Sequence, residues 1–183
     1  MTAANLVVLA SRTRRPEEPR ELCVVISCHQ LVCALPARTI ERLVLPDEVT
    51  ILAPDPETPR THSWDIALVG EERYAACNLG ALLAVPPLEA AWVLLRVRHK
   101  GGLVPIALQT GPCLIVQKLG AGVPLPSGAF RARSGAITSV FPTTLLANRG
   151  VAADVGLWLD PSHLWVESEL DAAAGALAEA GVS

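Results

Sequence analysis

The sequence has few aromatic side chains and no excess of positive charge. Among its 183 residues there are one Tyr, two Phe and four Trp, and the formal net charge at pH 7 is −3. Proteins that bind nucleic acid need a basic surface that displaces counterions from phosphates, and many also stack aromatic rings on bases. The composition therefore argues against a nucleic-acid partner.

The chain also lacks an apolar run that would cross a membrane. A spanning helix needs about 20 consecutive apolar residues. The longest apolar region, residues 75–95, is interrupted by one Asn, two Pro and one Glu. Residues 6–10 are too few for the apolar core of a signal peptide, and three arginines follow them instead of preceding them. We therefore expect no membrane insertion and a cytoplasmic location.

The five cysteines do not form an even set, as a secreted disulfide framework would require. Cys23, Cys28 and Cys33 are five residues apart on expected strands, where an odd spacing alternates between the faces of a sheet and gathers no metal ligands. The sequence therefore predicts free, mostly buried thiols and no metal site. The Gly-rich segments 101–102 and 120–122 lack the spacing of phosphate-binding loops, so no cofactor is expected.

No group of residues demands a catalytic function. Cys28 and His29 are adjacent, and adjacent strand residues point to opposite faces, which places them poorly as nucleophile and base. Segment 160–163, Asp-Pro-Ser-His, is typical of a helix start in which Asp160 caps the first turn. We expect a protein that is not an enzyme, with no catalytic residue. The enzymatic hypothesis, built on the same Cys and His with His163, predicts a reactive thiol.

Hydrophobic residues make up 51% of the chain, enough to bury a core in a compact protein. Short β-rich segments recur at close spacing and are separated by Gly and Pro, which indicates an all-β fold. A turn is expected at 70–73, one helical turn at 80–85, and an edge position for the strand that contains Pro105. The opening hairpin is expected to start at residue 22, turn at 28–30 and return into 34–36. The β-rich segments that follow are 49–53, 65–69, 74–79, 92–97, 103–108, 113–119, 137–141 and 151–159.

The two ends of the chain differ from this pattern. Residues 1–21 include the charged and proline-rich run SRTRRPEEPRE, which cannot bury a core, so a flexible N-terminal segment is expected. Residues 166–183 are expected to form a C-terminal helix, because acidic residues near its start complement the helix dipole and apolar residues recur at helical spacing. These apolar residues are Val166, Leu170, Ala173, Ala174 and Leu177.

The opening segment resembles the first hairpin of the CheW-like domain family of bacterial chemosensory adaptors and kinases. Residues 24–26 and 32–36 match its two strands, including the family's Leu-Pro, and residues 40–44 match the amphipathic segment that follows. Further matches occur in the family's order at residues 66–70, 75–79, 82–83, 92–97, 104–108 and 157–164. The resemblance covers residues 22–165 and implies two small SH3-like β-barrel subdomains, with the C-terminal helix outside the family core.

The same resemblance implies a non-catalytic adaptor or scaffold in a bacterial chemosensory or motility-signalling assembly. Its partners would be a chemosensory histidine kinase, a chemoreceptor or another CheW-like domain. Where the family usually carries an Arg before the turn Gly, this chain has Val69, which is either part of a drier contact or a plain core or edge valine. The alternative hypothesis is a diverged barrel that binds an unrelated regulatory protein. The candidate protein-binding residues are Leu35, Arg38, Glu41, Leu68, Val69, Gly70 and Arg73.

Overall fold

The apolar segment near the start of the chain folds into a hairpin of β1 (Glu21–Cys28) and β2 (Leu31–Pro36), with Cys28 opposite Leu31. The structure is a computed structural model and describes residues 20–28, 31–52, 64–86, 88–120, 122–125, 135–143 and 155–181. The hairpin expected here is therefore confirmed, whereas His29, nearly all of the N-terminal segment 1–21 and the proline-rich segment 54–59 lie outside the described residues.

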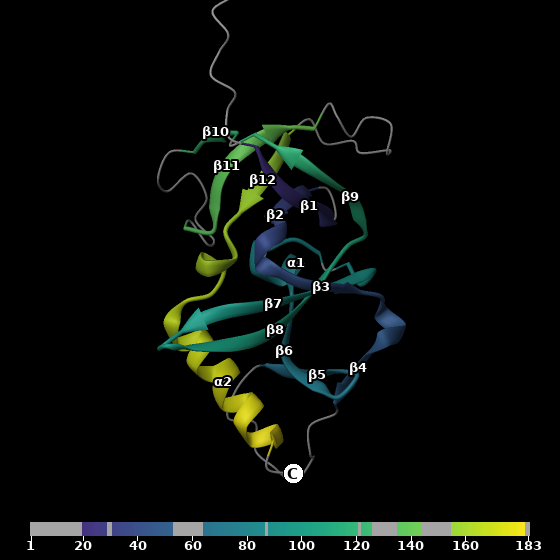
Figure 1. Ribbon diagram of the computed structural model, residues 1–183, viewed down its shortest axis with the longest axis vertical. Coiled ribbons are helices and arrows are strands. Elements are labelled where there is room, and N and C mark those ends of the chain that lie inside the picture. The colour runs from purple at the N-terminus through teal and green to yellow at the C-terminus, as the bar shows by residue number, and fades with distance from the viewer. Residues whose placement is uncertain are drawn as a thin grey trace, which may run out of the picture.

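The described strands form two six-stranded sheets (Figure 1). The first sheet, β10-β11-β12-β2-β1-β9, joins the opening hairpin to late strands, and the second, β3-β7-β8-β6-β5-β4, is built from the middle of the chain. The described chain is therefore mostly β, as the sequence predicts. The other strands are β3 (Ile40–Val44), β4 (Val49–Leu52), β5 (Asp65–Val69), β6 (Glu72–Asn78), β7 (Ala91–His99), β8 (Gly102–Thr110), β9 (Cys113–Leu119), β10 (Val123–Pro124), β11 (Ile137–Pro142) and β12 (Val155–Leu159).

Two tight turns fix the registers in the second sheet. Val69 pairs with Glu72, so the β5–β6 turn is only Gly70 and Glu71, and Gly70 has a φ of +62° that glycine adopts without strain. The turn expected over residues 70–73 is thus shorter in the structure. Lys100 and Gly101 join β7 to β8 with φ values of +45° and +81°, the signs that match the twist of a two-residue hairpin.

The prediction of an edge strand around Pro105 is wrong, because β8 lies between β7 and β6 in the sheet. The proline is accommodated by the register: pairing between β6 and β8 runs from Ala75 opposite Ile106 to Asn78 opposite Gln109 and does not reach residue 105. Pro105 has no N–H to donate. Pro105 therefore lies just outside the paired stretch of β6 and β8, where no backbone N–H is needed.

A single core connects both sheets and the terminal helix. It takes residues from β1, β2, β6, β7, β8, β11, β12 and the C-terminal helix, and we call it the shared core. Fully burying one such aliphatic side chain stabilises the fold by about 1.5–3 kcal/mol. Each sheet also has a smaller core on its other face. The largest fully buried members of the shared core are Ile26, Leu35, Leu79, Leu95, Ile106, Leu108, Leu159 and Leu164.

The cysteines follow this division, with one departure from expectation. All five thiols are free, and Cys23, Cys28 and Cys33 are buried. Cys28 and Cys33 belong to the shared core and Cys23 to the core of the first sheet. An odd spacing alternates faces only within one strand, and the hairpin turn between residues 28 and 33 restores the same face. The expectation that all three thiols alternate is therefore wrong for this pair.

Two helices begin at recognisable caps. The Asn78 side chain accepts hydrogen bonds from Gly80 N at 2.7 Å and Ala81 N at 3.4 Å and starts α1 (Leu79–Leu83). Glu169 accepts from Val166 N at 2.9 Å in the first turn of α2 (Glu167–Gly181), which confirms the expected C-terminal helix. None of the helices among the described residues is long and apolar enough to cross a membrane.

Helix α2 packs against the second sheet, where it contacts β5, β6 and β8 (Figure 1). Leu170 and Ala173 enter the shared core, and Ala174 and Leu177 lie at its margin. The rings of Trp64, before β5, and Trp165, before α2, are 6.4 Å apart and tilted by 43°. The helix thus covers part of the sheet formed by the middle of the chain.

The two glycines Gly156 and Gly175 give a matched pair of stability predictions. A Cβ on Gly156 would overlap the Phe141 ring, which packs edge-to-face on Trp158 in the first-sheet core. We expect Gly156→Ala to destabilise the protein by about 1–3 kcal/mol because the ring must move. Gly175→Ala, in α2 with open space around it, should stabilise it by about 0.5–1 kcal/mol. Urea unfolding measures both, and a neutral Gly156→Ala would contradict this packing.

Candidate protein-binding surface

Two of the candidate residues do not reach the surface. Leu35 is 0% exposed in the shared core, and Val69 is 4% exposed in the second-sheet core. The hydrophobic side chain at residue 69 is therefore part of the interior packing. A partner protein contacts exposed atoms, so these two residues support the surface from beneath.

The charged candidates Arg38 and Glu41 are exposed but already paired. Arg38 Nε lies 2.9 Å from a carboxylate oxygen of Glu21 on β1. Arg96 on β7 donates to both oxygens of Glu41, at 2.9 and 3.0 Å, and also to Glu72 at 3.1 Å. One arginine thus connects the two carboxylates and ties β3 to the start of β6. Such exposed pairs contribute little stability each, and their effect here is to fix the positions of neighbouring strands.

Tyr74 extends this network into the second-sheet core. Its hydroxyl donates to Glu72, while its ring is only 2% exposed. Burial, followed by the hydrogen bond to Glu72, raises the pKa of Tyr74 to about 12. The hydrogen bond to Glu41 is the largest reason that the pKa of Arg96 is also raised. The network is therefore a structural support in which Tyr74 stays neutral and Arg96 stays charged at neutral pH.

The remaining candidates lie on the β5–β6 hairpin and differ in what surrounds them. Leu68 is half-buried opposite Arg73, and Gly70 is exposed in the turn. Arg73 is partly exposed and makes no hydrogen bond or ion pair with any residue that the structure describes. Its Nη1 reaches the last turn of α2, 3.9 Å from the position that a Cβ on Gly181 would take. Arg73 is thus a cation available to a partner.

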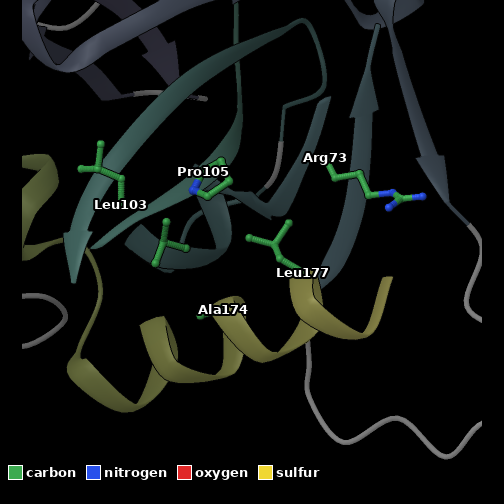
Figure 2. Close-up of a pocket in the computed structure, with 6 residues that line it drawn as sticks. Arg73, Leu103, Pro105, Ala174 and Leu177 are labelled. Atoms are coloured by element: carbon green, nitrogen blue, oxygen red, sulfur yellow. The ribbon is translucent and has the colours of Figure 1, made fainter. Parts of the chain in front are cut away.

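Arg73 borders a groove between α2 and β8 (Figure 2). The groove has a volume of about 320 Å³, and apolar side chains from both elements line the rest of it. Sequence reasoning found Arg73 but missed the other lining residues, because their contact depends on how α2 docks. The proline in an interior strand is the one sequence signal that could have indicated an irregular sheet here. These other residues are Leu103, Val104, Pro105, Ala174 and Leu177.

An ionic cluster holds α2 against the β7–β8 turn. Asp171 on the helix accepts from Lys100 Nζ at 2.6 and 2.8 Å, and His99 Nε2 lies 2.8 Å from the same carboxylate. Glu167 adds a longer contact to Lys100 at 3.8 Å. The hydrogen bond from Lys100, followed by that of His99, lowers the pKa of Asp171. The cluster fixes one end of the groove.

The Asp-Pro-Ser-His segment forms a cap and not a catalytic triad. Asp160 accepts from Ser162 N at 2.9 Å and starts the short 3-10 helix Pro161–His163, as the sequence predicts. Both Asp160 Oδ2, at 3.0 Å, and Ser162 Oγ, at 3.1 Å, approach the same ring nitrogen, Nδ1 of His163. A triad needs the acid and the nucleophile on different nitrogens. Burial opposes the ionised form of Asp160, but the hydrogen bonds of Ser162 and His163 prevail, so its pKa is lowered.

The buried thiols are also unsuited to nucleophilic catalysis. Burial raises the pKa of Cys28, and it raises that of Cys33 further, with the neighbouring Cys28 adding to the effect. A nucleophilic cysteine needs its thiolate stabilised, which is the opposite environment. Within the described ranges there is no group of three or more His, Cys, Asp and Glu placed to hold a metal ion.

The fold is similar to that of a known class of scaffold. The crystal structure of the scaffolding protein TtCheW from Thermoanaerobacter tengcongensis matches this chain with a TM-score of 0.59 and 12% sequence identity, over 82% of this chain and 96% of that one. No family model and no curated protein matches the sequence. At this identity the similarity establishes the fold, so the chain has a CheW-like fold of two sheets with a C-terminal helix.

Val69 and its neighbour Leu68 provide a test of the burial described above. We expect Val69→Arg to destabilise the protein by about 3 kcal/mol or more, because it places an unpaired charge in the second-sheet core. Leu68→Arg, on the opposite face of β5 and half-exposed, should change stability by less than about 1 kcal/mol. Chemical denaturation of both variants decides the point. Equal stability of the two would mean that Val69 faces solvent.

The Asp171 cluster predicts a dependence of stability on pH. Because the folded pKa of Asp171 lies below its ordinary value of 3.8, the carboxylate contributes stability above that value. The contribution is lost as the pH falls through the folded pKa. The difference in unfolding free energy between the parent protein and Asp171→Asn should therefore shrink below about pH 4. Asp47→Asn, an exposed residue without a cation partner among the described residues, is the control, and an unchanging difference for Asp171 would contradict the cluster.

Proposed function

We propose that this protein is a non-catalytic adaptor that couples proteins in a bacterial chemosensory or motility-signalling assembly. The observation that carries the proposal is the fold shared with a CheW scaffolding protein over nearly the whole of that chain. A fold alone hosts many functions. The chemistry of the side chains adds support, since the carboxylates and thiols described above serve packing, capping and strand fixation.

The partners proposed for it are proteins. They are a chemosensory histidine kinase, the cytoplasmic tip of a chemoreceptor, or another CheW-like domain, and the setting is the cytoplasm. Protein interfaces favour exposed surface in which a few apolar and Arg side chains are accessible. The candidate residues that reach the surface lie on the β2–β3 connection, near the start of β3 and on the β5–β6 hairpin. They are Arg38, Glu41, Leu68, Gly70 and Arg73.

A second candidate function is favoured by one observation. Val69 occupies the position at which CheW-like domains usually carry an arginine, and in this chain the side chain is buried. The contact that such an arginine would make is therefore absent from residue 69. A CheW-like domain that binds an unrelated regulatory protein, without receptor or kinase coupling, is consistent with this change.

Co-purification from an extract of the source cells separates the two functions. We expect the tagged full-length chain to retain a chemoreceptor or a histidine kinase, and the purified pair to bind in titration calorimetry. Leu68→Arg, expected to fold normally, should weaken that binding if the β5–β6 hairpin is part of the contact. Recovery of a different regulatory protein, with neither receptor nor kinase bound in the direct titration, would overturn the first proposal and support the second.

A further inference from the structure

We propose that the groove between α2 and β8 binds a segment of a partner protein that carries an aliphatic side chain next to a carboxylate, with Arg73 pairing to that carboxylate. The inference rests on the proposed adaptor function and deepens it, because it states the chemistry of the partner at one site. The occupant of the groove is a protein segment.

The groove lies beside the part of the second sheet in which β6 and β8 are not paired. Pairing of β6 with β8 begins at Ala75 opposite Ile106, so the earlier residues of β6, which include Arg73, diverge from β8. In an antiparallel ladder alternate residues direct their N–H away from the partner strand. Counted from the His99–Gly102 pair that closes the turn, Pro105 is one of the residues that face β6. Because Pro105 has no N–H, β8 cannot donate a backbone hydrogen bond to β6 at this position.

The walls of the groove suit an aliphatic side chain. Leu103 is 58% exposed, although leucine at this exposure gains by being covered. The Leu103 side chain points away from α2 and lies at the rim of the groove (Figure 2), while Ala174 and Leu177 of α2 are only partly buried on its helical side. A volume of about 320 Å³ is at the small end of ligand pockets. It accommodates a short segment and not the side of a long helix.

The charge at the groove indicates the second feature of the occupant. The nearby ionic groups already have partners: Glu72 is bound by Arg96 and Tyr74, and Lys100 by Asp171. Arg73 is the cation among the groove-lining residues, and its guanidinium extends past the apolar lining to the last turn of α2 (Figure 2), where it makes no hydrogen bond or ion pair with a described residue. A guanidinium presents paired donors that match the two oxygens of a carboxylate. An apolar groove with an arginine at its end is therefore complementary to an aliphatic residue beside Asp or Glu.

Two short peptides test this complementarity on the full-length protein. The probes are acetyl-Ala-Leu-Asp-Ala-amide and its matched neutral analogue acetyl-Ala-Leu-Asn-Ala-amide, added to isotope-labelled protein and followed by amide chemical shifts. We expect the Asp peptide to shift the amides of Leu103, Ala174 and Leu177 and to bind about fivefold more tightly than the Asn peptide, the factor for a partly solvated ion pair. Equal binding of the two peptides, or shifts confined to other surfaces, would overturn the proposal.

Matched variants assign the effect to the groove. Arg73→Gln should bring the affinity for the Asp peptide down to that of the Asn peptide, whereas Arg42→Gln, an exposed arginine on β3 that does not line the groove, should leave it unchanged. Leu103→Ser should weaken binding of both peptides. Its control is Leu45→Ser, since Leu45 is 60% exposed, close to the value for Leu103, and lies elsewhere. If Arg73→Gln still prefers the Asp peptide, the proposal fails.

The same variants distinguish this inference from the adaptor proposal. If the chain binds a receptor or kinase and both groove variants bind it with unchanged affinity, the groove inference is wrong and the adaptor function stands. If the Asp peptide binds as expected but neither receptor nor kinase does, the groove inference stands and the adaptor function is wrong. Thermal unfolding of each variant confirms that any lost binding is not lost folding.

Discussion

The structure depends on burying the central strands of both sheets on both of their faces. Within β1, Val24 and Ile26 enter the shared core while Cys23 and Val25 enter the first-sheet core, and β7 divides in the same way. Neither sheet therefore has a face that it could expose without uncovering aliphatic side chains. This constraint joins strands from the start, middle and end of the chain into one body, and it explains why the strand sequences are nearly continuous aliphatic segments.

Local sequence signals were sufficient for the elements but not for their contacts. The hairpin at residues 21–36, the cap at Asp160 and the helix after Val166 were all predictable, because turn residues, capping side chains and helical spacing act within a few residues. The position of β8 inside its sheet was not, since pairing with β6 links residues about 30 apart in the chain. The common face of Cys28 and Cys33 also escaped, because a turn resets the alternation on which the argument relied.

The candidate surface was predicted in the same uneven way. Resemblance to a family assigns positions, and it pointed to the β5–β6 hairpin, but it gives no account of which side chains are buried or already paired. Leu35 and Val69 face cores, and Glu41 is held by Arg96. Such outcomes follow from packing between segments distant in sequence, which neither periodicity nor motif order contains. Of the two candidate arginines, Arg38 is paired with Glu21, and Arg73 has no ionic partner among the described residues.

The groove beside Arg73 follows from the way that one proline is accommodated. A proline in an interior strand removes a donor from one side of the ladder, and the sheet divides beyond the last paired residue. Large side chains on α2 would fill the space between the unpaired parts of β6 and β8. Helix α2 has the small Ala174 there, and its Leu177 remains only partly buried. The contact between α2 and the sheet is instead secured at the turn by Asp171 with Lys100 and His99. Because the helix is fixed by charges at one end and by the shared core along its buried face, it is held in place without closing the groove.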